Sequence, residues 1–301
     1  DIKKKHPEID FNFLFLSDGF NVRNTELLVE IMRKHSINAV IHFAGLKAVG
    51  ESISMPIEYY SNNVQGAISL LGAMKLAKIK ALVFSSSACV YGNPQYLPID
   101  EGHPTSATNA YGRSKLHIEE MLKDVSIADP NWAILCLRYF NPVGAHDSGL
   151  IGEDPDGIPN NLSPFVAQVA AGIHDQLSIY GNDYPTPDGT GVRDYIHVMD
   201  LAAGHLAALN YLADHPGWDC MNLGTGNGYS VLDLVKAYQA TSGKAIAFKV
   251  LGRRLGDVAS CYAKVDKAKN LLGWQSKHSL ESMCASSWKW QQFRRALGDT
   301  Q

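Results

Sequence analysis

The segment Ala81-Leu-Val-Phe-Ser85 decides the fold, because it is a short apolar run that ends in serines between two helix-like stretches. Such a run predicts a strand that is buried on both faces of a parallel sheet. Upstream, residues 56–77 predict a helix, with Pro56 in the first turn, where the missing N–H group has no partner to lose. Before that helix, Ala39-Val-Ile-His-Phe-Ala44 predicts another buried strand.

The same alternation continues downstream of the serines. Residues 110–125 predict a helix, and Trp132-Ala-Ile-Leu-Cys-Leu137 predicts a strand. Strands and helices that alternate in this way form parallel pairs joined by right-handed crossovers. The sequence therefore predicts an α/β fold with a doubly wound, Rossmann-like parallel sheet.

The second half of the chain is less regular. Residues 141–192 are rich in Gly, Pro, Asn and Asp around one helical island at 163–172, which is typical of loops over an active site. A strand at 193–198 and a helix at 199–212 are expected next. The segments 221–223, 231–240 and 246–250, with two closing helices, indicate a smaller α/β lobe. We expect one domain at residues 1–145, to which 193–215 return, and a lobe formed mainly by 146–301.

Composition excludes several classes of protein. Of the 301 residues, 46% are hydrophobic and 19% are charged, which is typical of a globular chain. The net charge of −3 argues against a nucleic-acid partner. No apolar run approaches the roughly 18 residues that span a bilayer. The five cysteines occur singly, without C-x-x-C, which favours a reducing cytoplasm over disulfides or a metal site.

Two residues on the helix that follows the serines indicate chemistry. Tyr111 and Lys115 are four positions apart, so their side chains share one helix face. An ammonium group near a phenol favours the phenolate, so we expect a lowered pKa for Tyr111. Tyr111 could then act as a general base, with Ser87 donating or relaying a hydrogen bond. The alternative is an exposed tyrosine and lysine on a solvated helix face.

Longer motifs surround these residues. They are Ser85-Ser-Ser-Ala-Cys-Val-Tyr-Gly92, Tyr111-Gly-Arg-Ser-Lys115 and Leu137-Arg-Tyr-Phe-Asn-Pro-Val-Gly-Ala-His146. With them the chain resembles the extended short-chain dehydrogenase/reductases and, within these, the UDP-glucose (UDP-galactose) 4-epimerase family. Four further stretches extend the likeness: residues 42–52, 152–162, 181–186 and 188–200. The likeness runs from about residue 22 to the C-terminal helix.

The resemblance implies an NAD-dependent isomerase of galactose metabolism that interconverts UDP-glucose and UDP-galactose at sugar C4 through a 4-keto intermediate. Tyr111 would remove the proton of the 4′-hydroxyl, Ser87 would support that oxygen, and Lys115 would hold the nicotinamide ribose and keep Tyr111 ionised. A homodimer built on the helices that contain Asn62 and Tyr111 is implied too. Residues 1–145 would bind NAD, and the smaller lobe would bind the UDP-hexose.

The resemblance also implies a set of cofactor contacts. They are Phe43, Ala44, Gly45, Lys47, Asn62, Ser85, Tyr111, Lys115, Tyr139 and Pro142. A lysine just after a strand end can reach a pyrophosphate, and an asparagine within a helix is otherwise a poor helix former. For Phe43 and Ala44, plain packing at the strand end remains an alternative.

Substrate contacts follow from the same resemblance. They are Lys47, Ser87, Asn141, Asn161, Leu162, Tyr180, Arg193, Tyr195, Arg254, Asp257 and Cys261. The planar guanidinium of an arginine pairs well with diphosphate oxygens, although Arg193 and Arg254 could also be ordinary surface arginines. Cys261 replaces the tyrosine that some relatives carry, so room for an N-acetyl group is expected, unless Cys261 is simply a small buried thiol. His42 and His197 are expected in the core, and Asp147 in a loop; no metal site is expected.

The chain departs from the family pattern at its start. The first strand and its Gly-x-x-Gly-x-x-Gly turn, which would seat the pyrophosphate, have no counterpart, and residue 1 is Asp. Asn21 stands where an aspartate that contacts adenine is expected, and Asp18 is a possible substitute. Either the chain begins inside a longer protein, or it is a catalytically silent remnant that binds nucleotide-sugars. Retention of the Ser87, Tyr111 and Lys115 set favours the enzyme.

Other enzymes of the same superfamily are less consistent with the residues. A nucleotide-sugar 4,6-dehydratase would place acidic residues directly after the strand-end hydroxyl, where this chain has Ala88 and Cys89. A decarboxylase that acts on UDP-glucuronate would need an extra cation for the carboxylate, and no such residue is identified.

Overall fold

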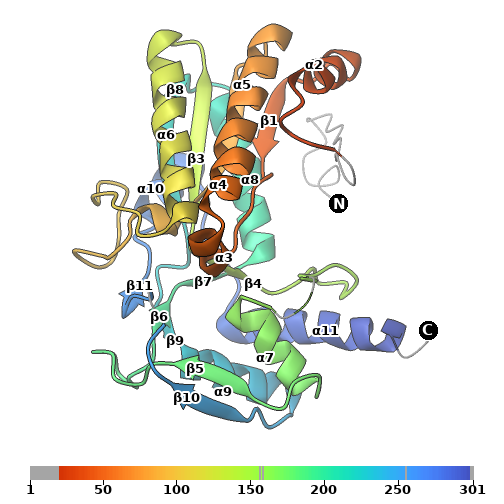
Figure 1. Ribbon diagram of the computed structural model, residues 1–301, viewed down its shortest axis with the longest axis vertical. Helices are drawn as coiled ribbons and strands as arrows, with labels where there is room; N and C mark the ends of the chain where they lie inside the picture. The colour runs from red at the N-terminus through yellow and green to blue at the C-terminus, as the bar shows by residue number, and fades with distance from the viewer. Residues whose placement is uncertain (1–19, 156, 158, 255, 299–301) are drawn as a thin grey trace.

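The structure, a computed structural model, describes residues 20–298 except 156, 158 and 255, so Asp18 lies outside the described residues. An upper part built around a sheet stands on a smaller lower part (Figure 1). Among the described residues, the upper sheet has four parallel strands in the order β1 (Ala39–His42), β2 (Ala81–Ser87), β3 (Ala133–Tyr139) and β8 (Gly217–Leu223). The predicted α/β fold with a Rossmann-like parallel sheet is confirmed.

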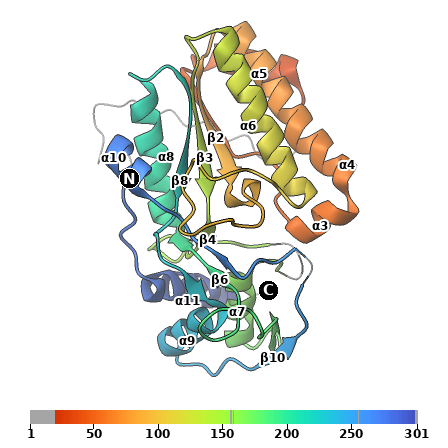
Figure 2. The same ribbon diagram turned by 90° about the vertical axis from the view of Figure 1, so that its left-hand side faces the viewer.

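Helices cover both faces of this sheet (Figure 2). One face carries α5 (Gln65–Ala77) and α6 (Ala110–Ala128), with α2 (Thr25–Lys34) packed on α5. The other face carries α8 (Val198–Leu212) and α10 (Asp266–Leu272). Within the described part of the chain, no helix is both long and apolar enough to cross a membrane.

The central strands alternate between two cores. Leu82 and Phe84 of β2 pack under α5 and α6, whereas Val83 packs toward α8. In β3, Ile134 joins the first core and Leu135 the second. Side chains of a strand point alternately to its two faces, so a continuous apolar run fills both cores.

The predicted helix at 56–77 is interrupted. After α3 (Val49–Ser54), the chain forms α4 (Pro56–Tyr59), a π-helical turn η1 (Tyr60–Val64) and then α5. A π-helical turn widens the helix by one residue and is frequent at functional sites. This turn contains Asn62, one of the predicted cofactor contacts.

The lower part has its own core. It contains α7 (Leu162–Ala170), α9 (Val231–Ser242) and α11 (Leu280–Gly298) around residues such as Val166, Leu234 and Met283. Its strands form three small sheets: β5 (Leu177–Tyr180) with β10 (Phe248–Leu251); β11 (Ser260–Cys261) with β6 (Val192–Arg193) and β9 (Tyr229–Ser230); and β4 (Asn141–Val143) with β7 (Tyr195–His197).

Two predicted elements differ from the structure. Residues 221–223, expected in the smaller lobe, belong to β8 at the edge of the main sheet, where Asn222 is fully buried. The expected strand 193–198 is divided between β6 and β7 at Asp194. The buried carboxylate of Asp194 accepts hydrogen bonds from the backbone N–H groups of Thr225, Gly226 and Ala263, so it joins three segments instead of continuing a strand.

Candidate active site

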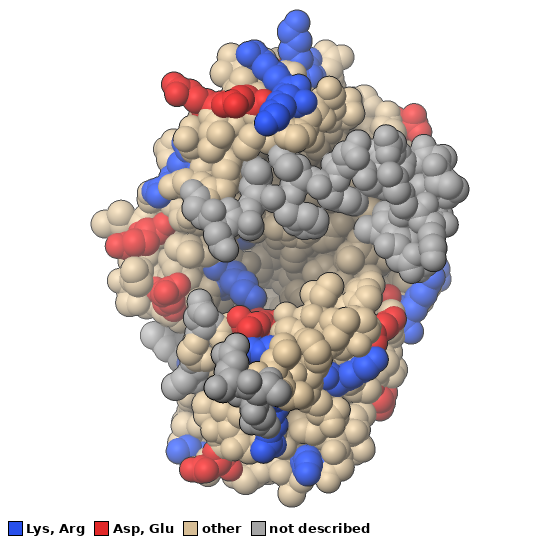
Figure 3. Space-filling model, turned by 90° about the vertical axis from the view of Figure 1, so that its right-hand side faces the viewer, with Lys and Arg blue, Asp and Glu red and all other residues tan. Residues whose placement is uncertain are grey.

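The predicted site residues gather where β1, β2 and β3 end, at the lower edge of the main sheet. The surface between the upper and lower parts is hollowed on the face shown in Figure 3. Parallel strands present their carboxyl ends at one edge, and ligands of α/β proteins bind there. Residues that are far apart in the sequence therefore meet at this edge.

Tyr111 and Lys115 are placed by the start of α6. The side chain of Asn109 caps this helix and accepts a hydrogen bond of 2.8 Å from the backbone N–H of Gly112, so Tyr111 lies in the first turn. One turn later, Nζ of Lys115 lies 5.9 Å from the centroid of the Tyr111 ring. Nζ also donates a hydrogen bond of 2.7 Å to the carbonyl oxygen of Ser85. The structure thus brings the phenol, the ammonium and the end of β2 together.

Ser87 completes this cluster. It is buried, and its hydroxyl oxygen accepts a hydrogen bond of 3.2 Å from the backbone N–H of Cys89. A side-chain hydrogen bond also joins Ser87 to Tyr111. In the sheet, Ser87 lies directly opposite Tyr139, which is a predicted cofactor contact. The serine hydroxyl is therefore fixed between the backbone after β2 and the phenol of Tyr111.

The prediction that the pKa of Tyr111 is lowered is wrong. Burial raises the pKa of Tyr111 well above its usual value, the nearby Cys89 thiol adds to this, and the hydrogen bond with Ser87 only partly opposes it. Burial also lowers the pKa of Lys115 to about 8, although the Glu119 carboxylate opposes that shift. Tyr111 is a neutral phenol in this environment, and Lys115 remains an ammonium at neutral pH.

A buried polar network lies behind the cluster. Glu119 accepts hydrogen bonds from Ser86 at 2.5 Å and from the guanidinium of Arg138 at 2.6 Å. Arg138 also donates to the hydroxyl of Tyr91 at 3.0 Å, and this hydroxyl donates to Asn222 at 2.7 Å. These side chains connect α6 to β2, β3 and β8. Because buried polar groups are costly unless they are all paired, the network fixes the strand ends that carry the site.

The first strand end presents an open surface. Phe43, directly after β1, is 58% exposed, and Ala44 and Lys47 are exposed as well. A Cβ atom added to Gly45 would lie only 3.2 Å from Oδ1 of Asn63 and 3.6 Å from Nζ of Lys115. The glycine thus keeps a small space open beside the buried ammonium.

Asn63, next to the predicted Asn62, was not identified from the sequence. Its amide accepts a hydrogen bond from the N–H of Leu46 at 2.8 Å, and it donates to the Leu46 carbonyl and to Ser114, each at 3.0 Å. Asn62 is half-buried and donates to Asn63 at 3.1 Å. The signal in the sequence is the pair of adjacent asparagines within a helix, of which only one was selected.

The end of β3 carries Tyr139, which forms a close hydrogen bond with Nε2 of His205 on α8. Tyr139 also has a hydrogen bond with Ser85. Asn141 and Pro142 follow and are exposed, and the backbone N–H of Asn141 donates to the carbonyl of Asp194 at 2.9 Å. His205 was not predicted as a site residue, because nothing in its sequence surroundings distinguishes it from a packed histidine.

Several predicted substrate contacts lie together in the lower part. Arg254 forms an ion pair of 3.1 Å with Asp257, and its guanidinium lies 5.4 Å from the centroid of the Tyr180 ring. Arg193 is 3.9 Å from the same Asp257 and lies opposite Cys261 in the sheet of β6 and β11. Two guanidinium groups therefore flank one carboxylate beside a small side chain.

Lys47 contacts a residue that is bonded to the lower part. Its ammonium forms an ion pair of 3.0 Å with Glu153, and Glu153 also accepts a hydrogen bond of 3.0 Å from Asn161, just before Leu162 begins α7. Glu153 was not predicted. Tyr195 does not face this group, because it is 3% exposed and packs in the lower core.

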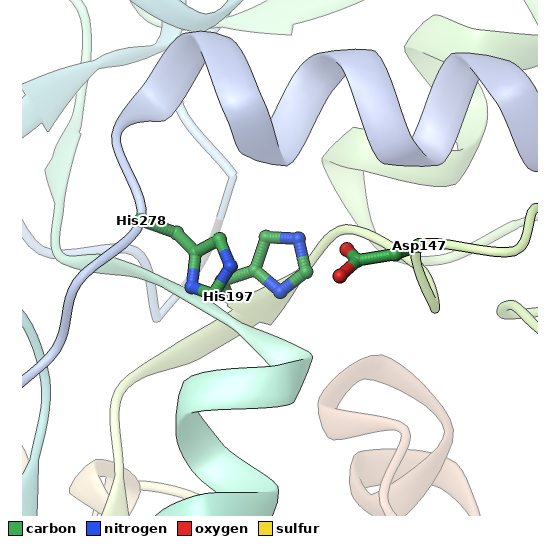
Figure 4. Close-up of side chains that lie close together, drawn as sticks. All are labelled: Asp147, His197 and His278. Atoms are coloured by element: carbon green, nitrogen blue, oxygen red, sulfur yellow. The ribbon is translucent and has the colours of Figure 1, made fainter.

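His42 and His197 are buried, as predicted for core histidines; burial lowers the pKa of His42 to about 3 and that of His197 to about 4. His197 lies close to Asp147 and His278 (Figure 4), with ligand-type atoms within 4.8 Å of one another. The two imidazole rings are stacked 4.1 Å apart, so their nitrogen lone pairs do not converge. Both His197 nitrogens are also engaged, with Met199 and Ser286. We assign no metal to this group.

A sequence profile, a relative and two solved structures are similar to this chain. A sequence profile described as GDP-mannose 4,6 dehydratase matches residues 2–287. The UDP-glucose 4-epimerase of Bacillus subtilis (strain 168) is 56% identical over 266 residues, which cover 88% of this chain and 78% of that protein. The structure is similar to UDP-glucose 4-epimerase from Bifidobacterium longum in complex with NAD+ and UDP, with a TM-score of 0.89, 53% identity, and coverage of 93% and 83% of the two chains. It is also similar to the enzyme from Stenotrophomonas maltophila with bound NAD and formylated UDP-arabinopyranose (TM-score 0.91, 47% identity, coverage 94% and 84%).

Proposed function

Because this chain belongs to the UDP-glucose 4-epimerase family of the extended short-chain dehydrogenase/reductases, we propose that it is an NAD-dependent isomerase that interconverts UDP-glucose and UDP-galactose. The reaction inverts sugar C4 through a 4-keto intermediate. The observation that carries the proposal is the meeting of Ser87, Tyr111 and Lys115 at the end of β2.

The residues fit a nicotinamide cofactor. The exposed ring of Phe43 and the space beside Gly45 lie at the strand ends, next to the buried Lys115 ammonium. We assign NAD to the part formed by residues 1–145 with 193–215, and the UDP-sugar mainly to 146–301. Ala44, Lys47, Asn62, Ser85, Tyr139 and Pro142 would line the same cofactor site. NAD held by these residues would supply the acceptor and donor of the hydride at sugar C4.

In the chemical step, the phenolate form of Tyr111 would accept the proton of the sugar 4′-hydroxyl. A buried neutral phenol is a poor base, so positive charge beside it is needed to favour the phenolate. Lys115 supplies this charge from the same helix face. Ser87, fixed by the N–H of Cys89, would hold the reacting oxygen by a hydrogen bond.

The UDP-sugar would lie over the lower part. Arg193 and Arg254 carry the positive charge that a diphosphate requires, and Asp257 between them can accept from ribose hydroxyls. Lys47, Asn141, Asn161, Leu162 and Tyr180 complete the proposed set, whereas Tyr195 is left out because it packs in the lower core. Cys261 is a small side chain beside Arg193, so we also propose that N-acetylated UDP-hexosamines are accepted. Conversion of UDP-galactose without conversion of UDP-GalNAc would remove this second proposal.

Assembly and location are also proposed. Several large apolar side chains on α3, α4 and α5 are exposed, namely Ile53, Ile57, Ile68 and Leu76. Large apolar side chains exposed on neighbouring helices favour an interface, and we propose a homodimer through these helices and α6. All five cysteines are free, which is consistent with a reducing cytoplasm. Light scattering of the purified protein tests the dimer, and a monomeric mass would rule it out.

The decisive experiment mixes the purified protein with UDP-galactose, without added NAD, and measures UDP-glucose. We expect conversion by the wild type and none by Tyr111→Phe, with the fold of the variant checked by circular dichroism. Near-normal activity of Tyr111→Phe would contradict the mechanism. No conversion even with added NAD would favour the silent nucleotide-sugar-binding protein. A product that has lost water would indicate a 4,6-dehydratase, although Ala88–Val90 after Ser87 contain no acidic residue.

A further inference from the structure

His205 on α8 contacts side chains from two different strand ends of the proposed cofactor site. Its Nε2 forms a close hydrogen bond with the Tyr139 hydroxyl at the end of β3. Its ring centroid lies 4.7 Å from that of Phe43, just after β1. Because α8 packs against β2 and β3, this one imidazole connects residues on both sides of the central strand β2.

The hydrogen bond of the second ring nitrogen, Nδ1, shows which nitrogen of His205 carries the proton. Nδ1 of His205 lies 2.8 Å from the carbonyl oxygen of Leu201, one turn earlier in α8. A carbonyl oxygen can only accept, so Nδ1 carries the proton and Nε2 has a free lone pair. The Tyr139 hydroxyl must therefore be the donor to Nε2. This arrangement needs a neutral histidine, and the side chain is 97% shielded from solvent, with 3% exposed.

The hydrogen bond determines where the Tyr139 hydroxyl points. Tyr139 lies opposite Ser87 in the sheet and close enough to Tyr111 for the two phenols to influence each other. A second mobile phenol beside Tyr111 could compete for its hydrogen bond with Ser87. His205 removes this competition by accepting a hydrogen bond from the Tyr139 hydroxyl on the side that faces α8.

The ring of Phe43 packs against His205. It is 58% exposed although it is a large apolar side chain, and the His205 ring packs against it at an angle of 46°. A flat ring exposed at a strand end is useful only if its orientation is maintained. The buried imidazole provides a fixed surface for it, since its own position is set by Leu201 and Tyr139.

We propose that His205 is a positioning residue, which orients Tyr139 and Phe43 as one wall of the cofactor site. It does not touch the reacting atoms. This inference rests on the proposed function for the identity of the ligand as NAD, whereas the tautomer and the Tyr139 bond do not depend on that function.

A matched control lies just beyond the end of the same helix. His215 has its Nδ1 2.8 Å from the carbonyl oxygen of Tyr211, again four residues earlier, but its side chain is exposed. The local bond of the imidazole to its own helix is thus the same in both residues. Of the two, only His205 has a tyrosine hydroxyl on Nε2 and is buried against Phe43, so His215 controls for loss of the local imidazole bond alone.

The functional arm measures the rate at which NAD leaves the holoenzyme after dilution into a trap, together with kcat and KM for UDP-galactose. We expect His205→Phe to release NAD about five- to tenfold faster, the equivalent of one hydrogen bond, while KM changes little. His205→Gln, which retains an acceptor, should restore most of the retention, and His215→Phe should behave as wild type. Unchanged NAD release in His205→Phe, or an equal effect in His215→Phe, would overturn the proposal.

A double-mutant cycle separates positioning from general destabilisation. In a Tyr139→Phe background, His205→Phe should have little further effect on NAD release, because the shared bond is already lost. Additive effects would contradict the proposal. If His205→Phe does not fold, the same cycle is measured with His205→Gln.

A spectroscopic arm is independent of the reaction. In ¹⁵N NMR of the histidine side chains, His205 should show the Nδ1–H tautomer. Its imidazole should stay neutral from pH 6 to pH 9, a range that begins near the ordinary histidine pKa. Tyr139→Phe should shift the Nε2 signal of His205 and leave that of His215 unchanged. If these signals are as expected but the wild type neither retains NAD nor turns over, the proposed function fails and the hydrogen-bond assignment stands. An unshifted Nε2 signal would refute the assignment itself.

Discussion

The upper and lower sides of the proposed active site are built differently. On the upper side, Lys115 is 4% exposed and Ser87 8% exposed, and both rest on the buried network around Glu119 and Arg138. On the lower side, Tyr180 is 42% exposed and Arg254 is also exposed, and the main partner of Arg254 is another site residue, Asp257. The comparison indicates that the upper side is fixed before ligand arrives, whereas the lower side can adjust. Substitutions on the upper side should therefore lower kcat, and substitutions on the lower side should raise KM.

The largest effect is expected from Lys115→Met on the fixed side. Loss of the ammonium removes the positive charge beside Tyr111, and kcat should fall about a thousandfold, within the range of general base catalysis. Steady-state kinetics with UDP-galactose give the value. Lys123→Met is the control, since Lys123 is exposed on the same helix and lies over the Trp218 ring. A fall in kcat of less than tenfold in Lys115→Met would show that the charge is not required.

Removing one partner of the buried ion pair tests why the upper side is fixed. Glu119→Gln leaves the Arg138 guanidinium with reduced compensation, and the free energy of unfolding should fall by about 3–5 kcal/mol. Urea denaturation measures it. The neighbouring Glu120→Gln is exposed and should change stability little. Equal stability of the two variants would mean that the network does not hold the strand ends.

On the adjustable side, Arg254→Ala should raise KM for UDP-galactose about tenfold while kcat stays within a factor of two. The reason is the loss of a charge-assisted hydrogen bond to the diphosphate in the ground state and the transition state alike. Arg253→Ala is the matched control, because Arg253 pairs with Asp183 and stacks on Tyr184 instead. A large drop in kcat for Arg254→Ala would contradict the division between the two sides.

The smallest effect concerns pH. Lys115 has a pKa lowered to about 8, so it is charged below that pH and loses its proton above it. The activity of the wild type should therefore decline as pH rises through about 8. The Glu119 carboxylate raises the pKa of Lys115, so Glu119→Gln should move this decline to lower pH. Profiles of kcat against pH test the shift, and a shift to higher pH would contradict the assignment.

The sequence predicted the upper side better than the lower side for a physical reason. Helix and strand periodicity relates neighbours along the chain, so Tyr111 and Lys115 could be placed on one face and the serines at a strand end. Spacing could not predict the sign of the Tyr111 pKa shift, because burial depends on the whole fold. Nor could it place β8, whose sequence Gly-Trp-Asp-Cys-Met-Asn-Leu contains Asn222, a polar residue whose hydrogen-bond partners are distant in the sequence.

Contacts between segments that are distant in the sequence could not be predicted either. The Lys47–Glu153 pair joins residues separated by 106 positions, and His205 meets Tyr139 across 66 positions. Resemblance to a family selected Lys47 and Tyr139, yet it did not show which side chains support them. Such partners become visible only when the packing of the helices against the sheet is known.

The π-helical turn η1 has a consequence for insertions and deletions. Asn63 in this turn holds Leu46 on one side and Ser114 on the other, so its direction around the helix axis matters. Deleting one residue from Tyr60–Val64 would convert the turn to regular α-helix with little rotation of α4 relative to α5, because a π-helical turn uses one more residue than an α-helix for the same rotation. The same deletion in the regular α5 would rotate everything before it by about 100°. A shortening of η1 would therefore keep the helix direction but remove the widened turn that presents Asn62 and Asn63.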